Sequence, residues 1–292
     1  MPFSKSILPV FLALLTTAGP LQAQAFEGLI RQRSLTVSED ALYELMWAAE
    51  DEEAEYETEE AYNQAMANAL FDLSDGDLEA MVAEGTADLG EFSVRIKGNR
   101  IRMEGGPGGG FSIVDLDSGT NWLVDPGKRT YVEFSKADAE EAQKKAEEMM
   151  ARLGLDADAM EEGGEGGGAT GEVSVMELGS IRTVNGFEAR GFRASSSEEY
   201  GEAWCSADGF GLSGALGRLA ELAQEMDEED QGGALEDEMC PETLPVLSKT
   251  FHPFAVLFEV SEVMAVEPGS QSPDLFEVPE GFRRIDMSEF WR

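Results

Sequence analysis

The sequence predicts an α+β fold in which amphipathic helices pack on one face of a curved antiparallel sheet. Three observations predict it. Short stretches that alternate between apolar and polar residues are joined by turns rich in Gly, Asn, Asp and Pro. Stretches with apolar residues at helical spacing are interleaved with them. The N-terminus carries an export signal, which indicates an exported protein.

The clearest pattern is the stretch EFSVRIKGNRIRME, residues 91–104. Gly98 and Asn99 form a two-residue turn, which pairs Lys97 with Arg100 and fixes the rest of the register. One face of the predicted hairpin then carries the apolar residues Val94, Ile96, Ile101 and Met103. The other face carries four cations, which we call the basic square: Arg95, Lys97, Arg100 and Arg102.

Like charges that face each other across two strands are unfavourable. The basic square is therefore predicted to be neutralised by the acidic helical insertion, by an adjacent strand or by an anionic partner. A solvated outer face of the sheet is the alternative, because most surface charges are simply hydrated.

The first 25 residues are predicted to be a signal peptide. An apolar run at Ile7–Leu15 precedes the sequence Ala23-Gln24-Ala25, which predicts cleavage between Ala25 and Phe26. The run is too short to span a bilayer, and no cysteine follows the cleavage site to carry a lipid anchor. We expect a periplasmic or extracellular protein without a transmembrane segment. The oligomeric state is left open.

Acidic residues dominate the composition. The chain has 59 Asp and Glu against 21 Lys and Arg, a formal charge of −38. This charge excludes sequence-independent nucleic-acid binding and argues against docking on anionic membranes. A solubilising surface suited to a saline exterior and a surface that binds divalent cations are both left open. No metal site or cofactor is predicted, because Asp75-Gly76-Asp77 misses the spacing of a calcium loop.

Cys205 and Cys240 are the two cysteines of the chain. Two cysteines in an exported protein usually pair, so we predict a structural disulfide. In the chain-entropy model such a loop contributes roughly 3 to 4 kcal/mol to stability.

We expect the elements in the following order. Strands are predicted at 26–37, 91–97, 100–104, 111–116, 121–124, 129–134, 173–177, 181–184, 187–193, 203–205, 255–266 and 275–278. Helices are predicted within an acidic insertion at about 39–83, at 135–153 and at 212–226. A Gly-rich flexible segment is predicted at about 161–171.

Five segments together resemble the DUF4412 domain: IKGNRIRME, IVDLDSGTNWLVDPGKRTY, VNGFEARGF, GEAWC and FEVPEGF. The resemblance covers about residues 84 to 283, with large gaps, and the acidic insertion departs from the family's pattern. That family is similar to the LolA/LppX-type lipoprotein-carrier fold, an incompletely closed antiparallel β-barrel whose mouth is plugged by helices. The resemblance implies a single domain over 26–292, an incomplete β-barrel with helices on its concave face. It implies no settled activity.

An enzyme is not predicted. The chain has a single histidine, His252, and no recognisable nucleophile elbow beside it. Carboxylates are so frequent that a pair of them carries almost no information about acid–base chemistry.

Two functions of different classes remain open. In the first, the protein is a non-enzymatic binding protein, a carrier of lipid or another hydrophobic ligand in the half-barrel. Its pocket would be lined by Val94, Ile96, Ile101, Met103, Trp122, Leu216 and Leu219. In the second, the protein is a structural or interaction protein with a filled core and an acidic, cation-binding surface. Both functions require the same apolar face.

Overall fold

The computed structural model describes residues 26–49, 56, 58–105, 109–135, 138, 173–208, 235–241 and 243–290. Several predicted features lie outside these residues: the signal peptide with Ala25, the helix at 135–153 apart from residues 135 and 138, the helix at 212–226 with Leu216 and Leu219, and the Gly-rich segment.

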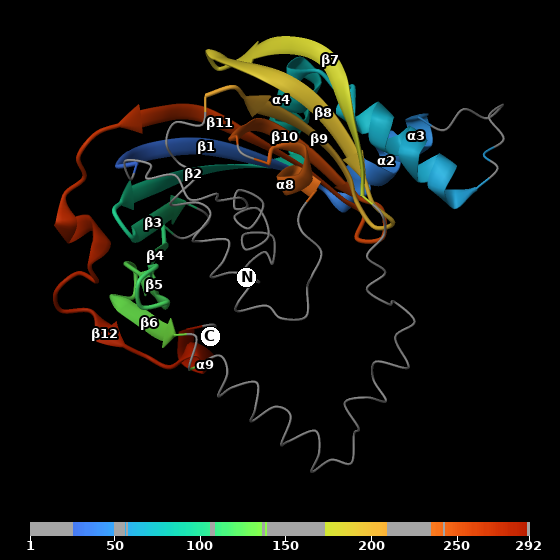
Figure 1. The fold of residues 1–292 in the computed structure, drawn as a ribbon. Helices are drawn as coiled ribbons and strands as arrows, with labels where there is room; N and C mark the ends of the chain where they lie inside the picture. Colours follow the sequence, from blue (N-terminus) through green and yellow to red (C-terminus); the bar gives the residue numbers. More distant parts are fainter. Residues whose placement is uncertain are drawn as a thin grey trace, which may run out of the picture.

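The described residues form one sheet of 12 strands, flanked by helices (Figure 1). The strands are β1 (Gly28–Val37), β2 (Ala87–Lys97), β3 (Arg100–Gly105), β4 (Phe111–Asp115), β5 (Thr120–Asp125), β6 (Thr130–Ser135), β7 (Ser174–Val184), β8 (Phe187–Ser195), β9 (Tyr200–Ser206), β10 (Pro245–His252), β11 (Leu257–Pro268) and β12 (Arg283–Arg284). The helices are α2 (Glu39–Ala49), α3 (Glu59–Phe71), α4 (Asp75–Glu84), α8 (Leu235–Met239), α9 (Met287–Phe290) and the 3₁₀ helix η2 (Pro273–Phe276).

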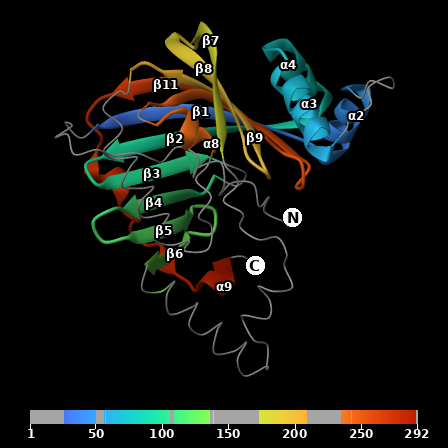
Figure 2. The ribbon, with the colours of Figure 1, turned by 45° about the vertical axis from the view of Figure 1, so that its right-hand side comes forward.

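The sheet consists of two antiparallel meanders joined in the middle. Strands β1 to β6 follow one another in space, as do β7 to β11, and β1 pairs with β11 to unite them. The short β12 pairs in parallel with β6 at one edge, and β7 forms the other edge. The predicted large, curved antiparallel sheet is confirmed, and it is open rather than closed (Figures 1 and 2).

The hairpin of β2 and β3 has the predicted register. Ile96 faces Ile101, Val94 faces Met103 and Arg95 faces Arg102. Turn chemistry and alternation agree at this hairpin: Gly98 takes the positive φ of 59° that its turn requires, and both strands alternate in phase with it. We call its two sides the Ile96 face and the Arg95 face, and we follow these faces across the sheet through the strand registers.

The acidic insertion is helical, as predicted. The hydroxyl of Thr58 accepts a hydrogen bond from the Ala61 amide and starts α3. Ser74 and Asp77 form a capping box at the start of α4, so the predicted break at this point also begins a new helix. The buried side of α3 carries Met66, Ala67, Leu70 and Phe71.

Three predictions of strands need correction. β10 was missed, because its sequence PVLSKTFH has no exposed position and does not alternate between apolar and polar residues. The strand predicted at 275–278 is wrong: Pro273 begins η2 there, and proline favours the first turn of a helix. The strands predicted at 173–177 and 181–184 are one strand, β7, with an irregularity between Glu177 and Ile181.

The chain after β11 forms what we call the strap, residues 269–286. It begins where the Gly269 amide donates to the Glu27 carbonyl, and near its end the Ile285 amide donates to the carbonyl of Tyr131 in β6. The strap therefore connects the centre of the sheet to its edge, passing through η2 on the way (Figure 1).

Candidate functional site

Four of the predicted pocket residues lie together on the Ile96 face. Ile96 and Ile101 have no exposed surface, Val94 is 5% exposed, and Met103 packs partly buried against the same cluster. Neighbouring strands continue this face, since Ile30 stands opposite Val94 and Val114 stands opposite Ile101. The result is a contiguous apolar surface across β1 to β4.

Trp122 lies on the other side of the sheet. The registers of β3, β4 and β5 place it opposite Ile113, which stands opposite Arg102 on the Arg95 face. Its indole Nε1 donates to Glu133 Oε2 at 3.1 Å. The inclusion of Trp122 in a pocket with Ile96 is therefore wrong. The side of the sheet on which Trp122 lies depends on the lengths of the connections between these strands. The alternation within a single strand does not determine it.

The basic square is neutralised within the protein, as predicted. Lys97 pairs with Glu27 at 2.7 Å, just before β1. Arg100 pairs with Asp115 of the adjacent strand β4 at 3.2 Å. Glu104 lies between Arg102, at 2.6 Å, and Arg95, at 3.4 Å. These acids belong to the strands or precede them, so the adjacent-strand alternative is the one confirmed.

Electrostatics at the basic square favour the charged forms. Burial alone would raise the pKa of Glu104, but the charges of Arg102 and Arg95 and their hydrogen bonds lower it below its usual value. The hydrogen bond from Lys97 lowers the pKa of Glu27 in the same way.

Three of the four cations of the basic square also bind the strap. Lys97 Nζ donates to the Gln271 carbonyl at 2.5 Å, and Arg95 Nη1 donates to the Gln271 side chain at 3.2 Å. Arg102 Nη1 donates to the Leu275 carbonyl at 2.8 Å, and its guanidinium lies 3.5 Å from the centre of the Phe111 ring. The basic square thus attaches the strap to the Arg95 face, a role that the sequence did not reveal.

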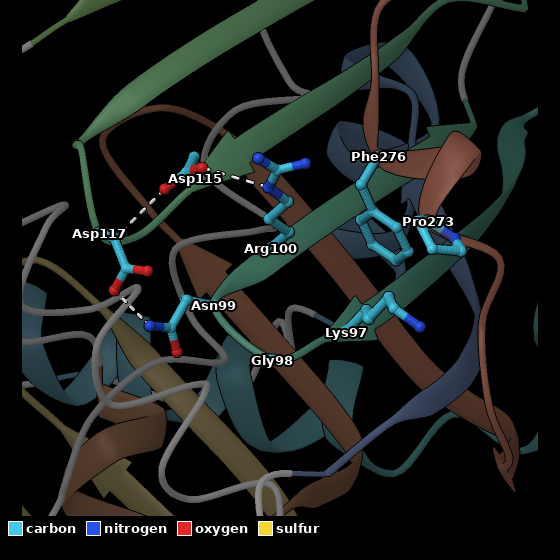
Figure 3. Close-up of a pocket in the computed structure, with 8 residues that line it drawn as sticks. All are labelled: Lys97, Gly98, Asn99, Arg100, Asp115, Asp117, Pro273 and Phe276. Carbon is cyan, nitrogen blue, oxygen red and sulfur yellow. Dashed lines mark hydrogen bonds and ion pairs between the residues drawn. The ribbon is translucent and has the colours of Figure 1, made fainter.

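A pocket of about 490 Å³ opens where the strap meets the tip of the β2–β3 hairpin (Figure 3). It is lined by Lys97, Gly98, Asn99, Arg100, Asp115, Asp117, Pro273 and Phe276. The sequence marked the two cations but gave no signal for the pocket, because Pro273 and Phe276 come from a distant part of the chain.

A second charged row lies on the Arg95 face in the other half of the sheet. Arg193, Glu202 and Lys249 stand side by side on β8, β9 and β10. Glu202 Oε2 accepts from Arg193 Nε at 2.7 Å, and Lys249 Nζ donates to the carbonyls of Phe71 and Leu73 at the end of α3. We call these three residues the buried row. They were not predicted.

The predicted disulfide between Cys205 and Cys240 is confirmed. The two Cα atoms are 5.6 Å apart, and the bond joins β9 to the residue after α8. Both cysteines are buried with Leu235 and Met239 in a separate apolar cluster.

His252 Nε2 lies 3.7 Å from Glu199 Oε1, and burial lowers the pKa of the His252 imidazole. Within the described ranges, no three His, Cys, Asp or Glu side chains are grouped as metal ligands would be. No helix in the described part of the chain is long and apolar enough to cross a membrane.

No family model matches the chain, and no curated protein matches it. The resemblance to the DUF4412 family therefore stays a prediction. Among solved structures, the chain is similar to an uncharacterized conserved protein from Thermus thermophilus, with 9% identity over 68% of this chain and 82% of that one and a TM-score of 0.35.

Two further solved structures are similar to the chain. PNGF-II matches with 8% identity, over 90% of this chain but 32% of its own, at a TM-score of 0.32. A DUF1329 family protein from Desulfovibrio piger matches with 9% identity, over 88% of this chain and 92% of its own, at a TM-score of 0.29. Because these TM-scores are below 0.5, the function has to be argued from the chain's own residues.

Proposed function

We propose that the protein is an exported, non-enzymatic binding protein that holds a hydrophobic ligand, such as the acyl chain of a lipid, against its Ile96 face. The observation that carries the proposal is that the two faces of the hairpin differ in chemistry, one charged and one apolar. The Arg95 face is occupied by paired charges and by the strap. The contiguous apolar surface on the other face is the one that suits such a ligand.

Three features support this proposal. The open sheet leaves its two edges, β12 and β7, apart. Met103 lies at the border of the apolar surface, and a flexible thioether can repack around ligands of different shape. The disulfide is typical of proteins that work in an oxidising, extracytoplasmic compartment.

A second function is favoured by one observation. Ile96 and Ile101 have no exposed surface. A filled core of this kind would make the protein a structural or interaction module whose acidic surface faces its surroundings. The two functions differ in one respect: in the first the apolar residues can give up contacts within the protein and contact a ligand, and in the second they cannot.

Native mass spectrometry of protein purified from its host, followed by titration with a fluorescent fatty acid, distinguishes the two functions. The binding proposal predicts a co-purified lipid or uptake of the probe, and it predicts that Met103→Trp blocks uptake with little loss of stability. The matched control is Leu89→Trp, on strand β2 of the same hairpin, because Leu89 is 48% exposed on the Arg95 face.

The opposite result supports the filled core. In that case the parent protein carries no lipid and takes up no probe. Met103→Trp then overpacks the interior and lowers the free energy of unfolding by about 1–3 kcal/mol.

A further inference from the structure

We propose that the pocket at the tip of the β2–β3 hairpin binds a small zwitterion, a molecule with one carboxylate and one ammonium group, such as a free amino acid. This site lies on the Arg95 face and does not depend on the hydrophobic site of the Ile96 face.

The lining charges balance. Lys97 and Arg100 contribute two positive charges, and Asp115 and Asp117 contribute two negative charges. A ligand with a single charge is attracted by one pair and repelled by the other. A simple anion is also repelled by the chain as a whole, whose formal charge is −38. Lys97 is already paired with Glu27. The groups left for a ligand are therefore the outer guanidinium edge of Arg100 and the carboxylate of Asp117, one of each sign. A zwitterion meets both groups and carries no net charge.

The carboxylate end of the ligand is recognised by Arg100. Its Nε donates to Asp115 Oδ2, and the other oxygen of Asp115 accepts hydrogen bonds from the backbone amides of Asp117 and Ser118. These bonds fix the guanidinium in place. Within the described part of the chain, the Nη1 and Nη2 atoms of Arg100 have no hydrogen-bond partner, and the side chain is 44% exposed. A free guanidinium edge is the group best suited to a carboxylate.

The ammonium end is recognised by Asp117. Its Oδ1 accepts a hydrogen bond from Asn99 Nδ2, which holds the carboxylate at the mouth of the pocket. Its Oδ2 has no partner among the described residues and is available to an ammonium group. Figure 3 shows Asp117 and Asn99 on one side of Arg100, with Phe276 and Pro273 on the other. The polar groups that would meet the ligand's charges therefore lie toward one side of the pocket, and the apolar residues lie toward the other.

The strap supplies the apolar wall. Pro273 is exposed and supplies apolar surface, and the ring of Phe276, which is 2% exposed, is held firmly beside it. A volume of about 490 Å³ lies within the roughly 300–1,000 Å³ typical of small-molecule sites and leaves room for an apolar side chain. An amino acid with an aliphatic or aromatic side chain fits these features best.

Isothermal titration of the full exported chain with L-leucine and L-phenylalanine tests the proposal. Two analogues separate the charges: 4-methylpentanoate has no ammonium group, and 3-methylbutylamine has no carboxylate. We expect binding of at least one amino acid and at least tenfold weaker binding of its single-charge analogues. We expect Arg100→Gln and Asp117→Asn each to weaken binding by about tenfold, because each removes a charged hydrogen-bonding group.

The control variant is Arg190→Gln, which removes an exposed arginine on β8 far from the hairpin and should bind like the parent protein. Circular dichroism establishes that each variant is folded. Equal binding of 4-methylpentanoate and L-leucine would overturn the proposal in favour of an anion site. Binding only to phosphatidylethanolamine vesicles, or no binding of any probe by the folded parent protein, would also overturn it.

Discussion

The basic square and the buried row are two groups of charges on the same face of one sheet, yet water reaches them very differently. In the basic square, the four cationic side chains keep between 13% and 44% of their surface exposed. In the buried row, Glu202 and Lys249 are each 4% exposed, and Arg193 at the end of the row keeps 23% of its side chain exposed. A strap of irregular chain covers the first group, and the end of α3 covers the second.

The difference shows in the pKa shifts. The partners of Glu104 lower its pKa, so folding favours its charged form. Burial lowers the pKa of Lys249, so folding disfavours its charged form. Its hydrogen bonds to the carbonyls of Phe71 and Leu73 compensate, because these carbonyls lack partners within α3. The basic square is stabilised by ion pairs between its own residues and their acidic neighbours. In the buried row, Lys249 instead holds the end of helix α3.

The largest effect is expected from Glu202→Gln. The substitution removes the buried charge beside Lys249, and among the described residues it leaves the more exposed Asp72 as the ion-pair partner of Arg193. Breaking a buried ion pair typically costs about 3–5 kcal/mol. Urea unfolding measures the change in the free energy of unfolding. The matched control is Glu104→Gln in the basic square, for which about 0.2–1 kcal/mol is expected. Equal losses at the two sites would show that burial does not distinguish them.

Next in size is removal of the disulfide that adjoins the buried row. We expect the double substitution of Cys205 and Cys240 by Ser to lower the free energy of unfolding by about 2–4 kcal/mol. Alkylation of the parent protein without reductant should label no thiol. Two labelled cysteines in the unreduced protein would contradict the bond.

A smaller effect is expected from Arg95→Gln combined with Arg102→Gln. Exposed ion pairs contribute only about 0.2–1 kcal/mol each, and salt screens them. Melting temperatures at low and high salt should therefore differ more for the parent protein than for the double variant. No change in melting at low salt would mean that the basic square is solvated and does not attach the strap.

The smallest effect is the pH dependence of Glu104. Since its folded pKa lies below the ordinary value of 4.5, its contribution is fully present above that value and is lost as the pH falls through the folded pKa. The stability difference between the parent protein and Glu104→Gln should shrink as the pH is lowered from about 7 to about 3. A difference that grows over this range would reverse the sign of the interaction.

The sequence predicts the hairpin well because two independent signals agree there. The Gly98-Asn99 turn and the alternation on either side of it specify one register, and the pairing of Ile96 with Ile101 follows. The sequence predicted an adjacent strand as one source of neutralising acids but did not identify the acids, because Asp115 meets Arg100 only through the pairing of β3 with β4.

The rest of the fold depends on contacts between distant residues. β10 contains the polar residues Ser248 and Lys249 at buried positions. Its sequence therefore lacks the pattern of a strand, and the strand becomes evident only from its pairing with β9 and β11. The position of β1 between β2 and β11 has no local signal. The hairpin-tip pocket combines residues near 100 with residues near 275, and no pattern in the sequence connects them.

The pairing of β1 with β11 also affects how the protein reaches its native state. Each meander can form from hairpins between neighbouring segments, but Arg33 of β1 meets Glu262 of β11 across 229 residues of chain. Loop closure over such a distance is entropically costly, and topologies rich in distant contacts fold slowly. During synthesis, β1 is the first of the described strands to be made, and its second neighbour, β11, is made only after most of the chain. The middle of the sheet is therefore completed late, and among the described strands only the short edge strand β12 follows β11 in the chain.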